Sequence, residues 1–458
     1  MRLHGAARMW VAIWAGAVQL PAQLTLTQAV ESALHNYPAV RVSQEQINAA
    51  AAGIRLARTA YLPRVDAVAQ INRATRNNVF GLLLPTQGVI PSMSGPVIGS
   101  NNFGTAWGSA VGTLVSWEPF DFGLRRANVD AAAAARAQSE AALVRTQFEV
   151  AAATADAYLT LAAAEETVRA ARAGVERSAT VARTIGALVK AELRPGADGS
   201  RAEAELAAAR TQLIQAEQAA EVARATVSQF VGIEPSQITL AAPRLVELPP
   251  EQNAAPLDTA THPAAREQNA IVAQAQAQLK ALERSYFPRF YLQGAAYARG
   301  TGAETDGRLL GGLNGLAPSV QDYALGITVS FPVADLPAVE AREAAQSAMV
   351  RAQAARAQQI ATDLRAQWHA AVAMLQGARR IAANTPVQVS AAHTTAEQAT
   401  ARYQSGLGNI DEVAEAQRLL TQAEIDDALA RLGVWRGLLA VATAAGDIRP
   451  FVAEVGQR

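Results

Sequence analysis

The sequence repeats itself at a constant spacing, and this repetition constrains the fold more than any other feature. Two clusters in the first half recur 225 positions later: Pro38, Ala39 and Arg41 as Pro263, Ala264 and Arg266, and Tyr61, Pro63 and Arg64 as Tyr286, Pro288 and Arg289. Internal repeats of this kind indicate duplicated structural units. We predict a first repeat over 23–232, a proline-rich connector over 233–257, a second repeat over 258–446 and a C-terminal tail over 447–458.

Each repeat begins with a helix and continues with two strands. The helices, expected over 38–62 and 263–287, are stopped by Pro63 and Pro288, because proline disfavours helical geometry in the residue before it. Strands are expected at about 64–73 and 106–117, and at about 289–299 and 322–331. In the last of these, Tyr323, Leu325 and Ile327 share one face, which is typical of a membrane β-barrel strand. An edge hairpin of a soluble protein is the alternative.

Long helices follow the strands in both repeats. Residues 124–190 and 338–405 are rich in Ala, Arg, Glu and Gln, which are good helix formers, and they carry heptad spacing. Each long helix is expected to turn back at a glycine-containing loop, with Gly196 and Gly199 in the first repeat and Gly406 and Gly408 in the second. Return helices are expected over 200–231 and 411–444. The pattern predicts a mostly helical, coiled-coil protein with a duplicated strand pair.

Composition excludes several classes of function. Among 458 residues, 40 Lys plus Arg balance 40 Asp plus Glu, so a nucleic-acid partner is disfavoured. Cysteine is absent, which removes disulfides, thiolate nucleophiles and a lipid anchor on cysteine. The five histidines show no metal-ligand spacing, and no phosphate loop or nucleophile elbow occurs. We therefore expect no enzyme activity, no cofactor and no metal site.

The N-terminus indicates export. Arg2 and Arg8 precede an apolar run from Met9 to Val18 and small residues that end at Ala22, as in a secretory signal peptide over 1–22. From Asn77 to Trp117 no residue is charged, but prolines and glycines interrupt the segment, so it is not a membrane-spanning helix. A membrane-bound form of this chain must therefore use β-strands. The uncharged segment 77–103 either folds over the mouth of such a barrel or forms a mobile loop.

Several short motifs occur in an order that resembles the TolC family of outer-membrane efflux and secretion channels. They are residues 24–38 (LTLTQAVESALHNYP), residues 61–65 (YLPRV), residues 119–126 (PFDFGLRR, with Pro119 and Gly123 at a strand-to-helix junction) and residues 403–413 (YQSGLGNIDEV). The resemblance covers about residues 24–446. The second junction, residues 331–337, lacks the glycine found after Phe122, so its geometry departs from the pattern of the first.

The resemblance implies a mostly helical fold with transmembrane β-structure. In that family three chains each give four strands to one 12-stranded barrel, which an α-helical coiled-coil barrel continues across the periplasm. The chain would then be a homotrimer in the outer membrane of a Gram-negative bacterium, in contact with outer-membrane lipid, and would act as the passive exit duct of a tripartite efflux or type I secretion system. Its partners would be a periplasmic adaptor (membrane fusion protein) and an inner-membrane pump. The residues do not distinguish drug, metal or protein cargo.

Acidic residues near the second helical turn are the candidate aperture. Through the resemblance, Glu412 and Glu415 correspond to the acids that line the periplasmic opening of the family. Their spacing places both carboxylates on one helix face, where three copies would form cation-selective rings. Asp411 and, in the first repeat, Asp198 are further candidates. The alternative is that acids in a first helical turn only complement the helix dipole.

A second class of function remains open from the sequence. An exported periplasmic coiled-coil scaffold or adaptor protein without a membrane barrel would also contain long helices. Adaptors are expected to carry one helical hairpin flanked by compact β domains, whereas this chain has two copies with apolar-alternating strand pairs. Extraction from membranes separates the two readings, because a scaffold should be released in buffer without detergent.

Overall fold

The computed structural model describes residues 23–75, 104–241, 243–251, 257–304, 308–331 and 333–456. The expected signal peptide, nearly all of the uncharged segment 77–103 and part of the connector lie outside these residues. The chain forms two compact units. Unit 1 comprises Met1–Gln44, Ala142–Arg266 and Gln359–Arg458, and unit 2 comprises Glu45–Ala141 and Glu267–Gln358. Each sequence repeat therefore contributes to both units.

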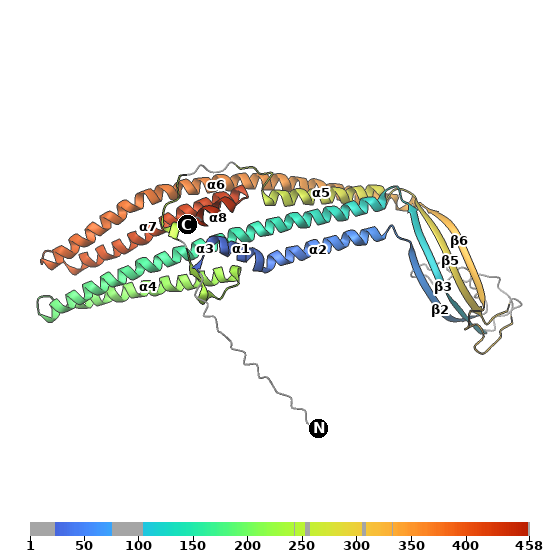
Figure 1. Cartoon of the computed structure of the whole chain (residues 1–458), viewed down its shortest axis with the longest axis horizontal. Helices are drawn as coiled ribbons and strands as arrows, with labels where there is room; N and C mark the ends of the chain where they lie inside the picture. Colours follow the sequence, from blue (N-terminus) through green and yellow to red (C-terminus); the bar gives the residue numbers. More distant parts are fainter. Residues whose placement is uncertain are drawn as a thin grey trace, which may run out of the picture. The chain divides into compact units, whose positions relative to one another are not determined.

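Unit 2 contains a four-stranded antiparallel sheet (Figure 1). Its strands are β2 (Arg64–Thr75), β3 (Thr105–Phe120), β5 (Arg289–Thr301) and β6 (Val320–Ser330), in the order β2-β3-β5-β6. The central pair, β3 and β5, joins the two sequence repeats, with Val115 opposite Gly294. The pairs of strands predicted from alternation thus lie next to each other in one sheet, and all four are as long as or longer than predicted.

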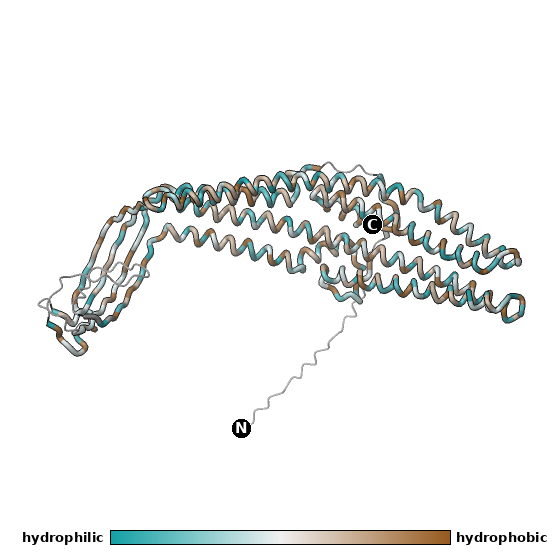
Figure 2. Tube along the Cα trace, turned by 180° about the vertical axis from the view of Figure 1, so that it is seen from behind, coloured by the Kyte–Doolittle hydropathy of each residue, from teal (hydrophilic) through white to brown (hydrophobic). Residues whose placement is uncertain are grey.

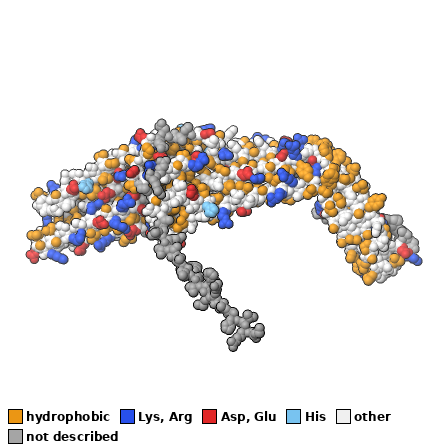
Figure 3. All heavy atoms as spheres, viewed as in Figure 1, with side chains coloured by type: hydrophobic (Ala, Val, Ile, Leu, Met, Phe, Trp, Pro, Cys, Tyr) orange, Lys and Arg blue, Asp and Glu red, His pale blue; other side chains and the backbone are white. Residues whose placement is uncertain are grey.

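The register of the sheet separates its two faces by polarity. Val65 lies opposite Val115, and Leu292 lies opposite Ile327, so large apolar side chains share one face. On β6 this face carries Tyr323, Leu325, Ile327 and Val329, all exposed. Figure 3 shows hydrophobic side chains covering the strands of unit 2 on the visible side. The opposite face carries mostly small and polar residues, among them Gln293, which accepts a hydrogen bond from Thr328 at 3.1 Å.

The helices that adjoin the sheet are α2 (Pro38–Thr59), α3 (Leu124–Lys190), α5 (Pro263–Arg284) and α6 (Leu336–Gln404), and each contributes residues to both units. Two begin with proline, which fits the first helical turn because its missing N–H has no intrahelical partner there. α6 is continuous through Pro386, where Thr385 donates its hydroxyl to Asp427 at 2.7 Å. A short 3-10 helix, η3 (Val333–Asp335), precedes α6.

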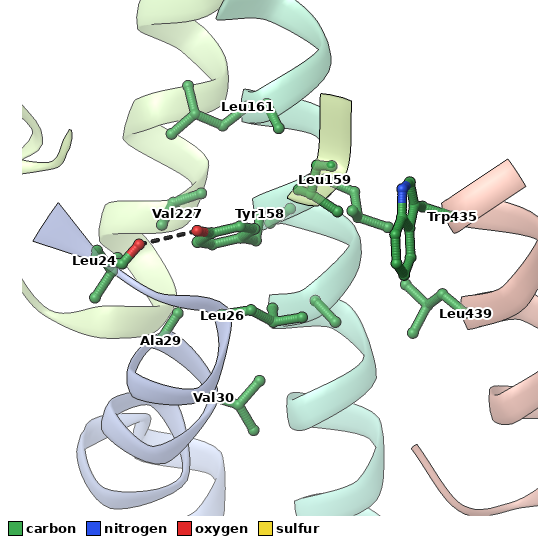
Figure 4. Close-up of a cluster of buried hydrophobic side chains, with 14 of the residues drawn as sticks. Leu24, Leu26, Ala29, Val30, Tyr158, Leu159, Leu161, Val227, Trp435 and Leu439 are labelled. Atoms are coloured by element: carbon green, nitrogen blue, oxygen red, sulfur yellow. Dashed lines mark hydrogen bonds between the residues drawn. The ribbon is translucent and has the colours of Figure 1, made fainter. Parts of the chain in front are cut away.

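Unit 1 also contains α1 (Leu26–Asn36), α4 (Gly196–Val231), α7 (Ile410–Ala445) and α8 (Arg449–Gly456). A parallel pair, β1 (Gln23–Leu24) with β4 (Thr239–Leu240), and two 3-10 turns, η1 (Pro235–Gln237) and η2 (Pro243–Val246), join the repeats. Figure 4 shows Tyr158 of α3 inside the core that these elements share. Its hydroxyl donates to the carbonyl oxygen of Leu24 at 2.9 Å. Trp435 lies in the same core and donates to the carbonyl oxygen of Glu247 at 2.9 Å.

Small side chains dominate the helix contacts elsewhere in unit 1. One core contains Ile185, Ala202, Tyr403 and Val413, together with several alanines of α6 and α7. At Gly437 a Cβ atom would lie 2.9 Å from the Cα atom of Leu375, so this glycine permits close approach of α7 to α6. Figure 2 shows hydrophobic and hydrophilic residues closely interspersed along these helices. Among the described helices, α7 alone is long and apolar enough to cross a membrane, and 44% of that stretch is buried within the protein.

Candidate functional site

Two helical hairpins of unit 1 carry all four candidate aperture acids. α3 and α4 are joined by residues 191–195, and α6 and α7 by residues 405–409. In the second turn Gly406 adopts a φ of 79°, and Asn409 caps α7 by accepting a hydrogen bond from the N–H of Glu412 at 2.9 Å. An asparagine N-cap is favourable because it satisfies an otherwise free amide. These two turns are called the hairpin tips below.

The glycines of the tips have different roles from those expected. In the first tip the left-handed residue is Glu192, with a φ of 58°, whereas Gly196 and Gly199 lie in the first turn of α4 after Pro195. Gly408 does lie in the second tip, where a Cβ atom would stand 3.1 Å from Glu412 Oε2. Gly408 therefore allows the Glu412 carboxylate to approach the turn, while Gly406 supplies its conformation.

A buried tyrosine joins the two tips. Tyr403 of α6 is 3% exposed, and its hydroxyl donates to Asp198 Oδ2 of α4 at 2.8 Å. The guanidinium of Arg194, from the first tip, lies 4.4 Å from the centre of the Tyr403 ring and also donates to the Tyr403 carbonyl oxygen. Burial and the hydrogen bond to Asp198 raise the pKa of Tyr403 to about 12. The hydroxyl is therefore a donor at neutral pH, and we call this group the tyrosine clasp.

Ion pairs reinforce the contact between the hairpins. Arg201 Nε of α4 lies 3.3 Å from Asp411 Oδ1 of α7, and Arg418 Nε of α7 lies 4.0 Å from Glu205 Oε2 of α4. Farther from the tips, Arg177 of α3 donates to Glu424 of α7 at 2.6 Å and to Thr421 of α7 at 3.0 Å. Most of these groups are part exposed, so each pair contributes about 1 kcal/mol or less.

The candidate acids at the second tip are exposed and each faces an arginine. The side chains of Glu412 and Glu415 are 46% and 72% exposed. Glu412 Oε2 lies 3.7 Å from Arg402 Nε, and Glu415 Oε2 lies 2.6 Å from Arg418 Nη2. The negative charge of these acids is thus partly balanced within the same hairpin. Asp198, in contrast, is engaged in the tyrosine clasp.

A groove of about 450 Å³ lies between α3, α4 and α7. Its walls include Ala171, Ala202 and Gln417, with Glu205 and Arg418 among the charged residues that line it. The Oε1 atom of Gln417 is buried and accepts no hydrogen bond from the described residues. The groove is therefore a mixed apolar and polar surface that runs beside the hairpin tips.

The strand-to-helix junction of unit 2 is organised by Asp121. Phe122 and Gly123 adopt φ values of 51° and 91°, which turn the chain from β3 into α3, and Pro119 lies at the end of β3. Asp121 accepts hydrogen bonds from the N–H of Gly123 at 3.1 Å, from the N–H of Arg125 at 2.6 Å and from Arg125 Nε at 2.9 Å. Burial opposes ionisation, but these donors outweigh it, so the pKa of Asp121 lies below its usual value.

Aromatic residues surround the same junction. Phe122 stacks on Phe287 at 5.1 Å, and Arg125 lies 4.8 Å from the centre of the Tyr61 ring. Pro63 lies between α2 and β2, and Pro288 lies between α5 and β5, at the two other entries to the sheet. The chain thereby passes from helices to strands through a buried ion pair and a ring cluster, which fixes the direction of β3 relative to α3 within unit 2.

Sequence reasoning missed the residues that connect the acids. The heptad spacing of residues 338–405 includes Tyr403 and predicts only that it packs between helices, and no sequence pattern points to Arg194, Arg201 or Arg402 as partners of the acids. The sequence does place arginines and a tyrosine within a few residues of each turn. It does not show which acid each of them contacts, because most of these acids lie on another helix. Among the described residues, no group of His, Asp or Glu is arranged to hold a metal ion.

Comparison with known proteins agrees with this architecture. The profile of the outer membrane efflux protein family matches residues 29–233 and 259–447. No curated protein sequence matches the chain. The structure is similar to the outer-membrane channel OprN, with a TM-score of 0.71, 23% identity, and 92% of this chain and 89% of OprN covered.

Two further outer-membrane proteins share the fold. The Campylobacter jejuni channel CmeC has a TM-score of 0.73 at 15% identity, with 92% of this chain and 85% of CmeC covered. The Vibrio cholerae outer membrane protein VceC has a TM-score of 0.69 at 18% identity, with 92% and 96% covered. The predicted fold class and family are confirmed by these matches, and the family places the protein in the outer membrane. The chain belongs to the outer membrane efflux protein family, the TolC family of outer-membrane channels.

Proposed function

We propose that the protein is the exit duct of a tripartite efflux or type I secretion system, formed by three copies of the chain. The sheet of unit 2 carries the proposal. One face is apolar and exposed, the other is polar, and within the described residues β2 and β6 each pair on one side only. Such a sheet must close to satisfy its edges in lipid, because a bilayer supplies no hydrogen-bond partners.

Closure between copies follows from the order of the strands. β2 of one copy would pair with β6 of the next, and three copies would give a 12-stranded barrel with the apolar face toward lipid. The family resemblance supports the number three. The polar face, with Gln293, Thr328 and Arg299, would then line the water-filled interior, and passage of cargo through it requires no catalytic step.

The hairpin tips would form the periplasmic aperture. The tyrosine clasp and the Arg201–Asp411 pair hold the two hairpins of one chain together, which favours a narrow opening. Glu412 and Glu415 would be repeated three times around it. Because Arg402 and Arg418 balance part of this charge, we expect a cation preference that is modest rather than absolute.

The groove beside the tips is the candidate docking surface for a periplasmic adaptor. Its small side chains permit close approach of a helix, and Glu205 and Arg418 offer polar partners. An inner-membrane pump would act through this adaptor. The proposal for both partners depends on the family resemblance and on the presence of the groove.

Fractionation and assembly state test the proposal. The protein is expressed with its N-terminus intact, and the membranes are washed with high salt and carbonate before detergent is added. We expect the protein to leave the outer membrane only in detergent and to have the mass of three chains in light scattering corrected for bound detergent. Release in buffer as a monomer would instead support the periplasmic scaffold.

A further inference from the structure

The connection between β5 and β6 contains an apolar segment that the proposed duct does not explain. Residues 308–317, called the leucine loop below, include Leu309, Leu310, Leu313 and Leu316. Leu313 is 73% exposed and Leu310 is 46% exposed. Exposed leucines gathered in one loop are unfavourable in water, so their presence indicates that another surface covers them.

Hydrogen bonds hold the leucine loop in one conformation. The N–H of Leu310 donates to the carbonyl oxygen of Gly302 at 2.9 Å, and Asn314 Nδ2 donates to the carbonyl oxygens of Leu310 and Gly311 at 3.1 and 3.0 Å. Gly311, Gly312 and Gly315 have φ values of 64°, 55° and 95°, which side-chain-bearing residues rarely adopt. The leucines are therefore presented by a defined turn.

The loop folds over the apolar face of the sheet. Gly300 of β5 lies opposite Ser109 of β3, in the same alternation as Val111 and Val115, so Gly300 and Ser109 belong to the apolar face. A Cβ atom on Gly300 would lie 2.3 Å from the Ala317 carbonyl oxygen and 2.8 Å from that of Gly315. Ser109 is 6% exposed, whereas Val111, the next residue of β3 on that face, is 48% exposed. The end of the loop thus covers the apolar face at Gly300 and Ser109.

The position of the loop along the strands corresponds to a membrane boundary. Trp107 lies two residues beyond Ser109 on the same face of β3, and the Arg73 guanidinium lies 5.3 Å from the centre of its ring. The N–H of Gly302 donates to the Trp107 carbonyl oxygen at 2.8 Å, which brings the loop to this level. Tryptophan and arginine at the end of an apolar belt are typical of the membrane–water interface.

We propose that the leucine loop inserts Leu310 and Leu313 into the outer leaflet of the membrane and contacts lipid acyl chains. This inference rests on the proposed function, in which the apolar sheet face contacts lipid. Continuity with that face favours lipid over a protein partner, because the loop presents exposed aliphatic side chains and contains none of the aromatic residues that enrich the cores of protein interfaces. Its one arginine, Arg308, is paired with Glu304 at 2.9 Å. The loop would then act as a rim anchor that sets the depth of the barrel.

Site-specific fluorescence tests the inference, since the absence of native cysteine makes a single label unambiguous. Leu313→Cys carries an environment-sensitive fluorophore in the full-length protein in phosphatidylcholine nanodiscs. Leu325→Cys, on the apolar face and 78% exposed, is the lipid-facing control, and Thr328→Cys, on the polar face, is the water-facing control. Circular dichroism confirms that each labelled variant retains the wild-type fold before it is used.

Quenching by doxyl-labelled lipid and by aqueous iodide separates the outcomes. We expect the label at position 313 to behave like the label at 325, with at least twofold stronger quenching by lipid than at 328 and little quenching by iodide. The inference is overturned if iodide quenches the label at 313 as strongly as the label at 328 while lipid still quenches the label at 325. That result would leave the proposed duct intact. Loss of lipid quenching at 325 as well would overturn the proposed function and the inference together.

Discussion

Removing the hydroxyl of Tyr403 tests whether the tyrosine clasp holds the two hairpin tips together. Tyr403→Phe keeps the buried ring under Arg194 and removes only the hydrogen bond to Asp198. A hydrogen bond to a charged group contributes about 1.5–3 kcal/mol. If the bond exists only in the closed aperture, its loss should raise the ratio of open to closed channels roughly tenfold or more.

Open probability in planar bilayers measures this effect. Asp411→Asn is the matched comparison, because its exposed pair with Arg201 contributes about 1 kcal/mol or less and should change opening much less. Equal opening of wild type and Tyr403→Phe would mean that the clasp does not hold the aperture closed.

The charges of Glu412 and Glu415 make a separate prediction for ion selectivity. Glu412→Gln with Glu415→Gln should lower the preference for cations. Arg402→Gln with Arg418→Gln should raise it, because these arginines balance part of the charge of Glu412 and Glu415. Reversal potentials in a salt gradient report both changes. Glu221→Gln, an exposed acid near the other end of α4, is the control and should leave the potential unchanged. If neither double variant changes the reversal potential, the aperture is formed by other residues.

His262 predicts a dependence of stability on pH. It is 6% exposed, its Nδ1 accepts a hydrogen bond from the N–H of Ala264 at 3.2 Å, and its Nε2 lies 3.3 Å from the Thr443 carbonyl oxygen. Burial lowers the pKa of His262, and the nearby Arg145 acts in the same direction, although Thr443 and Glu149 oppose them. The unfolded chain therefore binds the proton more readily, so this contribution is present above the unfolded pKa of about 6.5 and is lost as the pH falls.

The variant His262→Asn tests whether His262 causes a loss of stability as the pH falls. Asparagine is a good N-cap but does not titrate, so the variant should lose less thermal stability than wild type between pH 7.5 and pH 5.5. His393→Asn, at an exposed position on α6, should lose as much as wild type. Thermal unfolding of the detergent-solubilised protein, followed by circular dichroism, gives the comparison. Equal losses of thermal stability in wild type and His262→Asn would show that His262 is not the source of the pH dependence.

At the residue scale, the sequence predicted the positions of the acids but not their partners. Asp198, Asp411 and Glu412 lie in the first turn of the helix that follows each tip, where the helix dipole favours acids. Glu415 lies one turn further along α7. Their pairing with Tyr403, Arg201, Arg402 and Arg418 depends on how four helices pack, and neighbouring residues on different helices leave no mark in a single sequence. The predicted role of these acids in an aperture stays a prediction.

At the scale of elements, we expect the junction between β3 and α3 to contribute strongly to the stability of the fold through the Asp121–Arg125 pair. Asp121→Asn would leave the buried guanidinium of Arg125, which is 7% exposed, without its carboxylate. Breaking a buried ion pair by removing one partner typically costs about 3–5 kcal/mol. We expect a clear fall in the melting temperature of the detergent-solubilised protein, while Asp66→Asn, which breaks the exposed pair with Arg64, should cost about 1 kcal/mol or less. Similar melting temperatures for both variants would show that the junction does not depend on this pair.

Element boundaries followed well from composition and breakers, except at turns. Ala-rich composition and the absence of breakers predicted α3 over the residues that it occupies, and proline ended α2 and α5 within a few residues of the expected positions. The first hairpin tip differed because Pro195 starts α4 earlier than expected, which moves Gly196 and Gly199 into the helix and places Glu192 in the left-handed conformation. Local sequence could not reveal this, since Glu192 has no intrinsic preference for a positive φ.

At the scale of the whole molecule, the duplication predicted repeated elements but not their grouping. Each repeat crosses from unit 1 to unit 2 and back, so the sheet is built from both repeats, and β3 of one pairs with β5 of the other. Long helices that contribute to two units make this possible, and no composition change marks the boundary. The strand order, with β2 and β6 at the edges, likewise required the structure.

Single-channel recording shows whether three copies of this chain form a conducting duct. Purified wild-type protein and Tyr403→Phe are reconstituted in planar bilayers, and insertion is verified by lipid quenching of the label at Leu325→Cys in the same lipid. We predict discrete conductance steps in both, with the variant open far more often. Inserted, correctly folded trimers that never conduct, even with Tyr403→Phe, would contradict the account.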